Sequence, residues 1–323
     1  MIPPLIYLDR YRNEGTRIYS RHAGYTEAMD RYRPDSKHPT FDLPAFRLPR
    51  AELNVYTAGP SDTLRDAYLP DGEALFCVHP QLLESRDDEP YLRRILSVGK
   101  PVDPIPVSPS SSTRTLFVSG ASLPHALKVH FPFRVSRYER KMRDEVVEQA
   151  ITVSAELEAG IEGIDPGFAF LREVMGVTHK NLDPDSPRGE NWGYLVREMT
   201  PYPSVPGDRS LIPAFALYGR DFFDPEAPPL ILELKGEASP RDFLLDNLLL
   251  PIIRQWVDCF LSFGLVLEPH GQNVLLETDS NGAIRRLVHR DMSVAIDMRP
   301  RRDVGRPDGL LNGYNRMETG DFN

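Results

Sequence analysis

The sequence predicts an α+β protein with a small N-terminal lobe (1–105), a middle region built on an antiparallel sheet (106–235) and a helical C-terminal region (236–323). Short segments that partly alternate apolar and polar residues occur in the first two regions, which is typical of strands. The clearest helical pattern lies near the C-terminus, where apolar residues recur at helical spacing from 243 to 263. No internal repeat is visible, and we expect a cleft between the middle and C-terminal regions.

The N-terminal lobe is predicted to contain short strands and helices. Ser61 or Asp62 is a good N-cap for one helix, because its side-chain oxygen can accept a hydrogen bond from the first turn. Residues 1–50 show little periodicity and are expected to be partly loop. Four prolines between Lys100 and Pro109 predict a stiff, extended connector at the end of the lobe. The expected elements are strands over 52–58 and 74–78 and helices over 61–68 and 91–98.

Two longer helices are predicted in the rest of the chain. The first, 144–160, has an apolar face and ends at a glycine. The second, 243–263, contains Pro251, which predicts a kink or a break because proline lacks the N–H that a helix interior needs. Beyond Arg299 the chain is charged and shows no core pattern, so a frayed tail or one ordered by contact is expected. Strands are expected over 113–118, 126–131 and 193–198, and the segments 168–174 and 211–218 fit either a helix or a strand.

Composition narrows the class of protein. The 323 residues are 41% hydrophobic and 26% charged, as in ordinary globular proteins. A net charge of −9 without a basic stripe argues against nucleic acid as a partner. Cys77 and Cys259 both lie in apolar contexts, so two buried thiols are expected rather than a disulfide framework or a zinc site. No signal peptide and no membrane-spanning run is visible, so a cytoplasmic protein without membrane contact is expected.

The stretch from Gly264 to Asp291 has the features of a nucleotide and metal site. An apolar segment ends in a cluster of polar residues, and a strong turn at 278–282 sends a second strand back beside that cluster. Glu268, Asn273 and Asp291 could then face one point, and carboxylate and amide oxygens suit Mg²⁺ that is shared with substrate phosphates. A polar hairpin with solvated charges is the plainer alternative.

A second group of residues has the chemistry of an anion site. Lys128 and Arg140 flank a predicted strand and its turn, and together they offer a point charge and a planar fork for phosphate. A solvated basic face is the alternative here. Upstream, Ser112, Arg114 and Thr115 supply hydroxyls and a guanidinium that can hold a carboxylate or a phosphate.

Taken together, these motifs resemble the NRPS-independent siderophore synthetases of the aerobactin-synthetase type. The resemblance runs from about 110 to 291 and implies a cupped-hand fold of thumb, fingers and palm, with ATP and Mg²⁺ in the cleft. It also implies adenylation of a carboxylic acid, followed by attack of an amine or an alcohol to give an amide or an ester, and a homodimer. The matching elements are Ser112-x-Arg114-Thr115, Lys128 with Arg140, Arg197-Glu198, Glu268-x-His270-x-Gln272-Asn273 and Arg290-Asp291.

Carried over by position, the resemblance assigns a role to each site residue. Arg114, Lys128, Arg140 and His270 would be catalytic, with Lys128 and Arg140 on the ATP phosphates. Ser112, Arg114 and Thr115 would lie near the reacting carboxylate and the α-phosphate. The nucleotide would be lined by His270, Gln272, Asn273 and Asp291, and the metal would be held by Glu268, Asn273 and Asp291.

The chain departs from the family pattern in two ways. Members are commonly close to twice this length, so the resemblance implies a shortened, diverged member. Val135 precedes Ser136 where a threonine is common, which removes one hydroxyl near the phosphates.

Two other functions fit the residues. A phosphotransferase could use Glu268, Asn273 and Asp291 in the manner of a kinase, although no Gly-rich loop precedes Lys128. The other alternative is a non-catalytic relative that binds a nucleotide or a metabolite. AMP as product would favour the ligase and ADP the kinase.

Overall fold

The computed structural model shows a mixed α+β protein, so the predicted fold class is confirmed. It describes residues 4–14, 25–85, 89–183, 185, 192–306 and 316–317. The chain forms two compact units, whose positions relative to one another are not determined. Unit 1 comprises 1–19, 152–172 and 200–323, and unit 2 comprises 20–151 and 173–199. Each unit therefore joins segments that lie far apart in the sequence.

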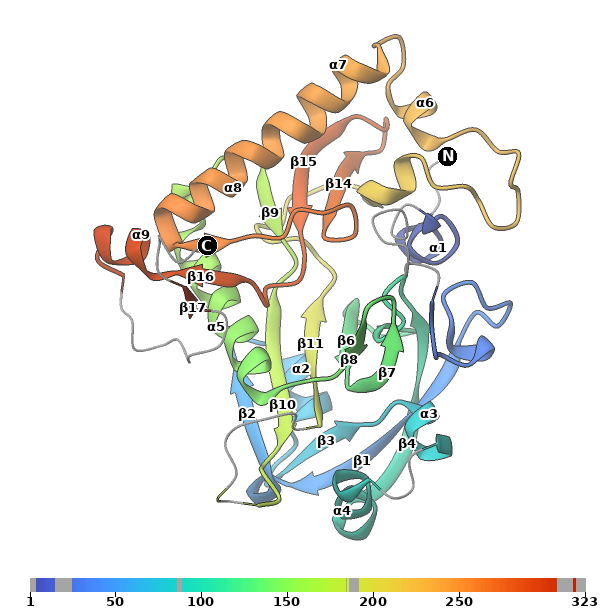
Figure 1. The fold of residues 1–323 in the computed structure, drawn as a ribbon, viewed down its shortest axis with the longest axis vertical. Coiled ribbons are helices and arrows are strands. Elements are labelled where there is room, and N and C mark those ends of the chain that lie inside the picture. The colour runs from blue at the N-terminus through green and yellow to red at the C-terminus, as the bar shows by residue number, and fades with distance from the viewer. Residues whose placement is uncertain are drawn as a thin grey trace. The chain divides into compact units, whose positions relative to one another are not determined.

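Unit 2 is built on a large antiparallel sheet (Figure 1). Among the described residues the sheet has eight strands in the order β2-β10-β11-β6-β5-β4-β1-β3, and every neighbouring pair runs antiparallel. A separate hairpin, β7–β8, follows β6. The strands are β1 Phe41–Pro49, β2 Leu53–Thr57, β3 Glu73–Cys77, β4 Lys100–Pro109, β5 Thr115–Val118, β6 His125–Val129, β7 Phe131–Val135, β8 Tyr138–Arg140, β10 Glu173–His179 and β11 Gly193–Glu198.

The proline-rich segment predicted as a connector is strand β4, so that prediction was wrong. β4 pairs with β1, which lies in a part of the chain that was expected to be partly loop. Because β5 pairs only with 107–109, the first part of β4 has a strand partner on one side, and prolines are tolerated where a backbone N–H would face away from the ladder. The three-region division by sequence stays a prediction, and its boundary at 105–106 lies inside β4.

The helices of unit 2 at 62–68, 90–98 and 144–160 lie where the sequence patterns predicted helices, whereas the helix at 80–85 was not predicted. Ser61 caps α2, because its Oγ accepts a hydrogen bond from the backbone N–H of Leu64 at 3.3 Å. The first half of α5 packs closely on the sheet at Gly176, where a Cβ would lie 2.2 Å from Cγ1 of Val147. The helices are α2 Asp62–Tyr68, α3 Pro80–Ser85, α4 Pro90–Val98 and α5 Asp144–Gly160, the last of which continues into unit 1.

Unit 1 combines two small sheets with most of the C-terminal helices. Within its described part, one sheet has the order β12-β14-β15-β9, and the other has the order β13-β16-β17. β9 pairs with β15 in parallel, so a segment near 170 joins the predicted hairpin. The strands are β9 Phe168–Phe170, β12 Arg209–Pro213, β13 Leu265–Val266, β14 Val274–Asp279, β15 Ile284–His289, β16 Ala295–Asp297 and β17 Arg316–Met317. The helices are α1 Leu5–Tyr11, α6 Leu230–Leu234, α7 Pro240–Leu244, α8 Leu250–Phe263 and α9 Met298–Asp303.

The long C-terminal helix is interrupted just before Pro251, as the sequence predicted. α7 ends at Leu244, a π-helical turn covers Leu245–Leu249, and α8 begins at Leu250. Widening of this turn gives the proline ring room and removes the need for its missing N–H. None of the helices in the described part of the chain is long and apolar enough to cross a membrane.

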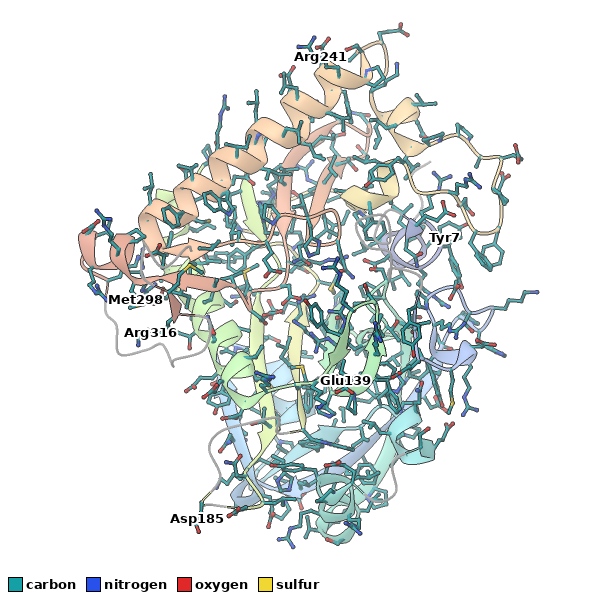
Figure 2. The ribbon with its side chains drawn as sticks, in the orientation of Figure 1. Tyr7, Glu139, Asp185, Arg241, Met298 and Arg316 are labelled. Atoms are coloured by element: carbon teal, nitrogen blue, oxygen red, sulfur yellow. The ribbon has the colours of Figure 1, made fainter. Side chains whose placement is uncertain are left out.

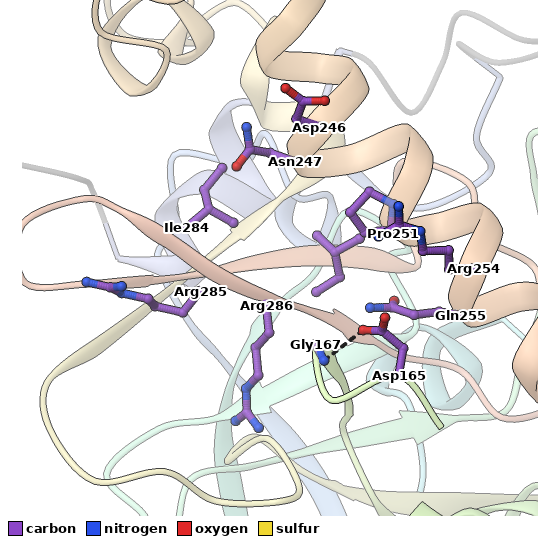
Figure 3. Close-up of a pocket in the computed structure, with 11 residues that line it drawn as sticks. Asp165, Gly167, Asp246, Asn247, Pro251, Arg254, Gln255, Ile284, Arg285 and Arg286 are labelled. Atoms are coloured by element: carbon purple, nitrogen blue, oxygen red, sulfur yellow. Dashed lines mark hydrogen bonds between the residues drawn. The ribbon is translucent and has the colours of Figure 1, made fainter. Parts of the chain in front are cut away.

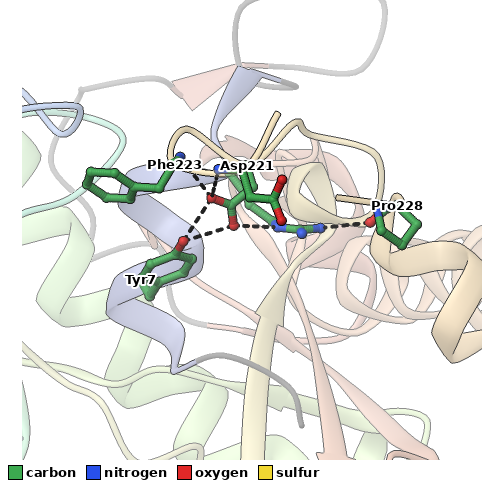
Figure 4. A network of polar contacts seen from close by, with 6 residues as sticks. Tyr7, Asp221, Phe223 and Pro228 are labelled. Atoms are coloured by element: carbon green, nitrogen blue, oxygen red, sulfur yellow. Dashed lines mark hydrogen bonds and ion pairs between the residues drawn. The ribbon is translucent and has the colours of Figure 1, made fainter. Parts of the chain in front are cut away.

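The N-terminal helix α1 is tied into unit 1 by a buried carboxylate (Figure 4). The hydroxyl of Tyr7 donates to Asp221 at 2.8 Å, and Nε of Arg12 donates to the same carboxylate at 3.1 Å. Burial, together with the Asp221 carboxylate, raises the pKa of Tyr7 to about 12. This network fixes a helix whose own sequence gave little periodic signal.

The segment after Arg299 is better ordered than its sequence suggested. It contributes α9, which begins at Met298 (Figure 2), and Arg301 of this helix is fully buried. Its guanidinium donates to Glu156 at 2.8 Å and to the carbonyl of Phe263 at 2.8 Å. The frayed alternative is therefore wrong for 300–306, which these contacts order, while most of 307–323 lies outside the described residues.

Candidate functional site

Thr115 and Lys128 lie directly opposite each other on β5 and β6. Opposed residues of antiparallel strands project from the same face of a sheet, and both side chains are buried. Leu195 of β11 lies on the other side of Lys128, and Arg197, two residues further on, forms a buried ion pair with Glu173. The structure thus brings together two of the predicted phosphate-binding residues on one buried face.

Ser112 shapes the turn that leads into β5. Its Oγ lies 2.9 Å from Oγ of Ser110 and accepts a hydrogen bond from the backbone N–H of Thr115 at 3.2 Å. Thr113, which follows Ser112, has a φ of +70°, a left-handed conformation that residues other than glycine rarely adopt. The hydroxyl of Ser112 is therefore used to hold the loop.

Arg114 connects this turn to the segment after β8. Its Nη1 donates to the backbone carbonyls of Arg140 at 3.1 Å and Lys141 at 3.0 Å. The guanidinium thereby fixes the backbone at Arg140, which is 26 residues away in the sequence. The structure supports a positioning role for Arg114, in addition to the catalytic role that the resemblance implies.

Two buried polar atoms near this segment lack a partner within the described part of the chain. They are Nε of Arg140 and Oγ of Ser136. A buried donor without an acceptor costs about 1–3 kcal/mol, so each such atom calls for an explanation, of which a bound ligand is one. Ser136 also has a φ of +63°. In the sequence this serine stood out only as the neighbour of Val135, and its missing partner was not visible there.

The second candidate group, in unit 1, is a tight turn between β13 and β14. The backbone N–H of His270 donates to the carbonyl of Glu268 at 2.9 Å, and that of Asn273 donates to the carbonyl of His270 at 2.8 Å. Nδ1 of His270 accepts from the backbone N–H of Gln272 at 3.2 Å. Asn273 is buried, whereas Glu268 and His270 are exposed. The polar cluster predicted after the apolar strand is therefore one compact turn.

Arg290 joins this turn to the return strand. The backbone N–H of Arg290 donates to the carbonyl of Asn273 at 2.9 Å, and its Nε donates to the carbonyl of Gln272 at 2.7 Å. Its Nη1 donates to Asp9 of α1 at 2.7 Å, and both members of this ion pair are buried. The hairpin therefore does return beside the cluster, as predicted. Asp9 was missed, because no local pattern marks a partner 281 residues away.

Backbone conformation singles out the same segments. Among the described residues, the non-glycine residues with a positive φ are Thr113, Ser136 and Asp291, the last at +75°. Such conformations cost on the order of 1–3 kcal/mol and cluster at functional sites. Each of them lies in or beside a motif chosen from the sequence on chemical grounds.

The arrangement is compatible with Mg²⁺ that is shared with a nucleotide. No group of three or more His, Cys, Asp or Glu side chains is placed to hold a metal ion in the portion of the chain described here. Mg²⁺ in phosphate-transfer sites needs only one or two carboxylates, since phosphates and water complete its shell. Glu268 and Asp291 could supply these carboxylates, and Asn273 an amide oxygen. The roles predicted for these residues stay predictions, and the two groups belong to different units.

His125 and His130 are buried in unit 2. His125 lies 2.7 Å from the hydroxyl of Tyr68. His130 accepts a hydrogen bond from the backbone N–H of Met142 at 3.0 Å and stacks on Trp192. Burial lowers the pKa of His130 to about 3, so it is neutral at physiological pH.

Unit 1 also contains a cavity of about 160 Å³ between α8 and β15 (Figure 3). None of the predicted site residues lines it. Gln255 does, and its carbonyl oxygen lies 2.8 Å from Nε2 of His289, while its Nε2 has no partner among the described residues.

Comparison with solved structures shows which proteins share this fold. The chain is similar to the petrobactin biosynthesis protein AsbB from Bacillus anthracis str. Sterne, with 16% identity and a TM-score of 0.72 over 97% of this chain and 56% of that chain. It is also similar to ATP-bound aerobactin synthetase IucA from a hypervirulent pathotype of Klebsiella pneumoniae, with 15% identity and a TM-score of 0.70 over 92% of this chain and 58% of that chain. Aerobactin synthetase IucC from the same pathotype matches at 17% identity with a TM-score of 0.66, over 95% of this chain and 57% of that chain. The fold is thus the one found in aerobactin synthetases, and this chain spans less than two thirds of their length.

The family follows from the sequence itself. Residues 23–219, more than half of the chain, match the IucA / IucC family, and the chain belongs to this family. The match includes the candidate residues of unit 2 and ends before the hairpin of unit 1. No curated protein matches the chain. The resemblance read from the motifs is therefore confirmed.

Proposed function

We propose that the chain is an ATP- and Mg²⁺-dependent ligase that joins a carboxylic acid to an amine or an alcohol through an acyl-adenylate. Family membership supports this proposal, and so does the description of one structural relative as ATP-bound. The observation that carries it is a pair of buried polar atoms, on Arg140 and Ser136, that have no partner in the described part of the chain and lie next to a backbone that Arg114 holds in place. A guanidinium N–H buried without an acceptor is suited to an anionic ligand such as a phosphate.

Each site residue has a proposed role that follows from its side-chain chemistry. Lys128 and Arg140 would bind phosphate oxygens, and fixed cations stabilise the charge that develops there during adenylation. Ser112 and Arg114 would hold the loops that present these groups, and Thr115 would offer a hydroxyl beside Lys128. His270, Gln272 and Asn273 would contact the nucleotide. Mg²⁺, when bound through Glu268, Asn273 and Asp291, would supply charge neutralisation on the phosphates.

The test is ATP turnover with Mg²⁺ against a panel of polycarboxylates, each combined with amines and amino alcohols, with AMP separated from ADP. We expect AMP and pyrophosphate only with particular acids. ADP as the product would overturn the ligase in favour of phosphotransfer. ATP binding without turnover across the panel would instead favour a binding protein.

Two variants test the site assignment. Lys128→Met keeps an apolar stem in the buried position and removes the charge, and Asp291→Asn keeps a residue type that tolerates a left-handed backbone. Each should lower AMP formation at least 100-fold while unfolding by urea changes little. Lys100→Met is the matched control, because Lys100 is a surface lysine with a 78% exposed side chain. Turnover by Lys128→Met that equals the control would disprove the phosphate-binding role.

A further inference from the structure

The cavity between α8 and β15 contains a buried amide with an unused donor. Gln255 of α8 lines this cavity and is fully buried. Its Oε1 lies 2.8 Å from Nε2 of His289, and because an amide oxygen can only accept, the histidine nitrogen is the donor. Burial lowers the pKa of His289 to about 4, so the ring is neutral and its single N–H is used in this contact. The amide of Gln255 is thereby oriented, and its nitrogen has no partner among the described residues.

A carboxylate faces the same space as this amide nitrogen. A Cβ at Gly167 would lie 2.9 Å from Oδ1 of Asp165 and 3.7 Å from Nε2 of Gln255, so both polar atoms surround one point that the glycine leaves open. Figure 3 shows the side chains of Asp165 and Gln255 next to each other in the wall of the cavity. Oδ1 of Asp165 accepts the backbone N–H of Gly167 at 2.7 Å, but the carboxylate has no cationic partner within the described part of the chain. A donor and an anion are therefore presented to the cavity together.

The cavity also offers a positive charge and apolar walls. Arg285 and Arg286 line it, but their guanidinium groups are already paired with Asp279 and Glu277. Arg254 lines it as well, and its guanidinium forms no ion pair or hydrogen bond with any described residue. Arg254 is therefore the cation that is left for a ligand. The apolar walls are formed by Pro251, Ile284 and Leu287.

We propose that this cavity binds a small α-amino acid with an aliphatic side chain. The ammonium group of the ligand donates to the carboxylate of Asp165. Its carboxylate accepts from the amide nitrogen of Gln255 and from the guanidinium of Arg254, and its side chain lies against the apolar walls. Hydrogen bonds between charged groups are about twice as strong as neutral ones, so these contacts fix the orientation of the ligand.

The size and the charges of the cavity favour an amino acid over other ligands. Pockets for drug-sized ligands measure about 300–1,000 Å³, so a cavity of about 160 Å³ restricts the ligand to a small molecule. A simple carboxylic acid would bring a second negative charge beside Asp165. A simple amine would leave Gln255 and Arg254 without an acceptor. A molecule that carries both groups on neighbouring atoms satisfies all three side chains.

The test is isothermal titration calorimetry of the full chain, without ATP, against L-alanine, L-valine and L-leucine. We expect at least one of them to bind with a Kd of roughly 1 mM or tighter. For the tightest of the three, the amine that lacks the carboxylate and the acid that lacks the ammonium group should each bind at least tenfold more weakly. For leucine these are 3-methylbutylamine and 4-methylpentanoate. No binding by any of the three, or binding of the amine or the acid as tight as that of the amino acid, would overturn the proposal.

Two glycine variants locate the binding. Gly167→Ala places a methyl group in the space between Asp165 and Gln255 and should weaken binding at least tenfold. Gly163→Ala is the matched control, because a Cβ there meets no atom within 4 Å, and it should keep the affinity within about twofold. Urea unfolding shows that both variants are folded. An amino acid that binds Gly167→Ala as tightly as the wild type lies elsewhere on the chain, and this result would also overturn the proposal.

Variants of the polar side chains test each contact separately. Asp165→Asn keeps an oxygen for the backbone N–H that it accepts but removes the charge, so it should abolish the preference for the amino acid over the acid that lacks the ammonium group. Gln255→Glu keeps an acceptor for His289 and replaces the unused N–H by an oxygen, which should weaken binding at least tenfold. Arg254→Gln should do the same, and Arg241→Gln, at an exposed arginine of α7 outside the cavity lining, is its control. A preference that survives Asp165→Asn would contradict the proposed ammonium contact.

This proposal does not depend on the ligase activity. None of the residues assigned to the phosphates, the nucleotide or Mg²⁺ lines the cavity. Binding of the amino acid without ATP therefore tests the cavity alone, and a failure of the ligase proposal would leave that result unchanged.

Discussion

Arg290 is the residue whose removal we expect to damage unit 1 most, and Arg290→Ala is the change we would make. In the native chain its guanidinium bridges the Asp9 carboxylate and the Gln272 carbonyl, both at 2.7 Å. The side chains of Arg290 and Asp9 are 5% and 0% exposed, so the alanine variant leaves a carboxylate buried without its counter-charge.

The size of the effect follows from this burial. Breaking a buried ion pair by removing one partner costs about 3–5 kcal/mol, since the remaining charge stays buried and has lost this counter-charge. Arg290→Lys keeps a positive charge near Asp9, but lysine has no nitrogen at the position of arginine Nε, so we expect the backbone contact to Gln272 to be lost. A hydrogen bond from a charged group contributes about 1.5–3 kcal/mol, so the lysine variant should lose an amount in that range.

Urea unfolding measures these losses. Trp256 lies in unit 1 and donates to the carbonyl of Leu267 at 3.0 Å, so its fluorescence reports on this unit when Trp192 is replaced by Phe. Arg285→Ala is the control from the same hairpin, because Arg285 pairs with Asp279 at the surface with a side chain 55% exposed. Such a pair contributes at most about 1 kcal/mol. A loss below about 1 kcal/mol for Arg290→Ala, or equal losses for the alanine and lysine variants, would refute the reasoning.

Two further predictions concern unit 2. Gly176→Ala should lower the free energy of unfolding by about 1–3 kcal/mol, because the new Cβ would lie 2.2 Å from Cγ1 of Val147. Gly59→Ala is the comparison in the same urea experiment, since a Cβ there meets no neighbour within 4 Å but the residue has a φ of +55°. The two variants therefore separate the effect of packing from that of backbone strain. Burial lowers the pKa of His79 from 6.5 to about 3, so the unfolded chain binds this proton first, and stability should fall as the pH drops from about 6.5 towards 3 and be unaffected above that window. His79→Asn keeps an acceptor for the backbone N–H of Gln81 and should reduce the slope of unfolding free energy against pH between 6 and 4 by about 1.4 kcal/mol per pH unit. An unchanged slope would show that His79 is not held neutral by the fold.

Local chemistry in the sequence was enough to place most helices and the hairpin. The apolar pattern and the terminal glycine of 144–160 give α5 with the predicted bounds, and Ser61 caps α2 as expected. The turn at 278–282 joins β14 and β15. These features depend on contacts between residues close in sequence, which a periodic pattern records directly.

The candidate site was predictable in its residue types and only partly in its contacts. Charged and hydroxyl side chains at family-like spacing identified both groups. The sequence could not show that Arg114 binds the backbone beside Arg140, or that Oγ of Ser136 is buried without a partner among the described residues. Such contacts depend on the register of β5 to β8, and register is set by pairing between strands rather than by any one strand.

The sequence by itself determined the fold class, the helices α2, α4, α5 and α7–α8, and the residue types that suit an ATP-dependent ligase. Only the tertiary structure decided that the proline-rich segment is a strand of the large sheet, that Asp9 neutralises Arg290, and that Arg301 is buried in what reads as a charged tail. The physical reason is the same in each case. A buried charge or an edge proline is favourable only because of a partner, and these partners lie far away in the sequence, where no local pattern can indicate them.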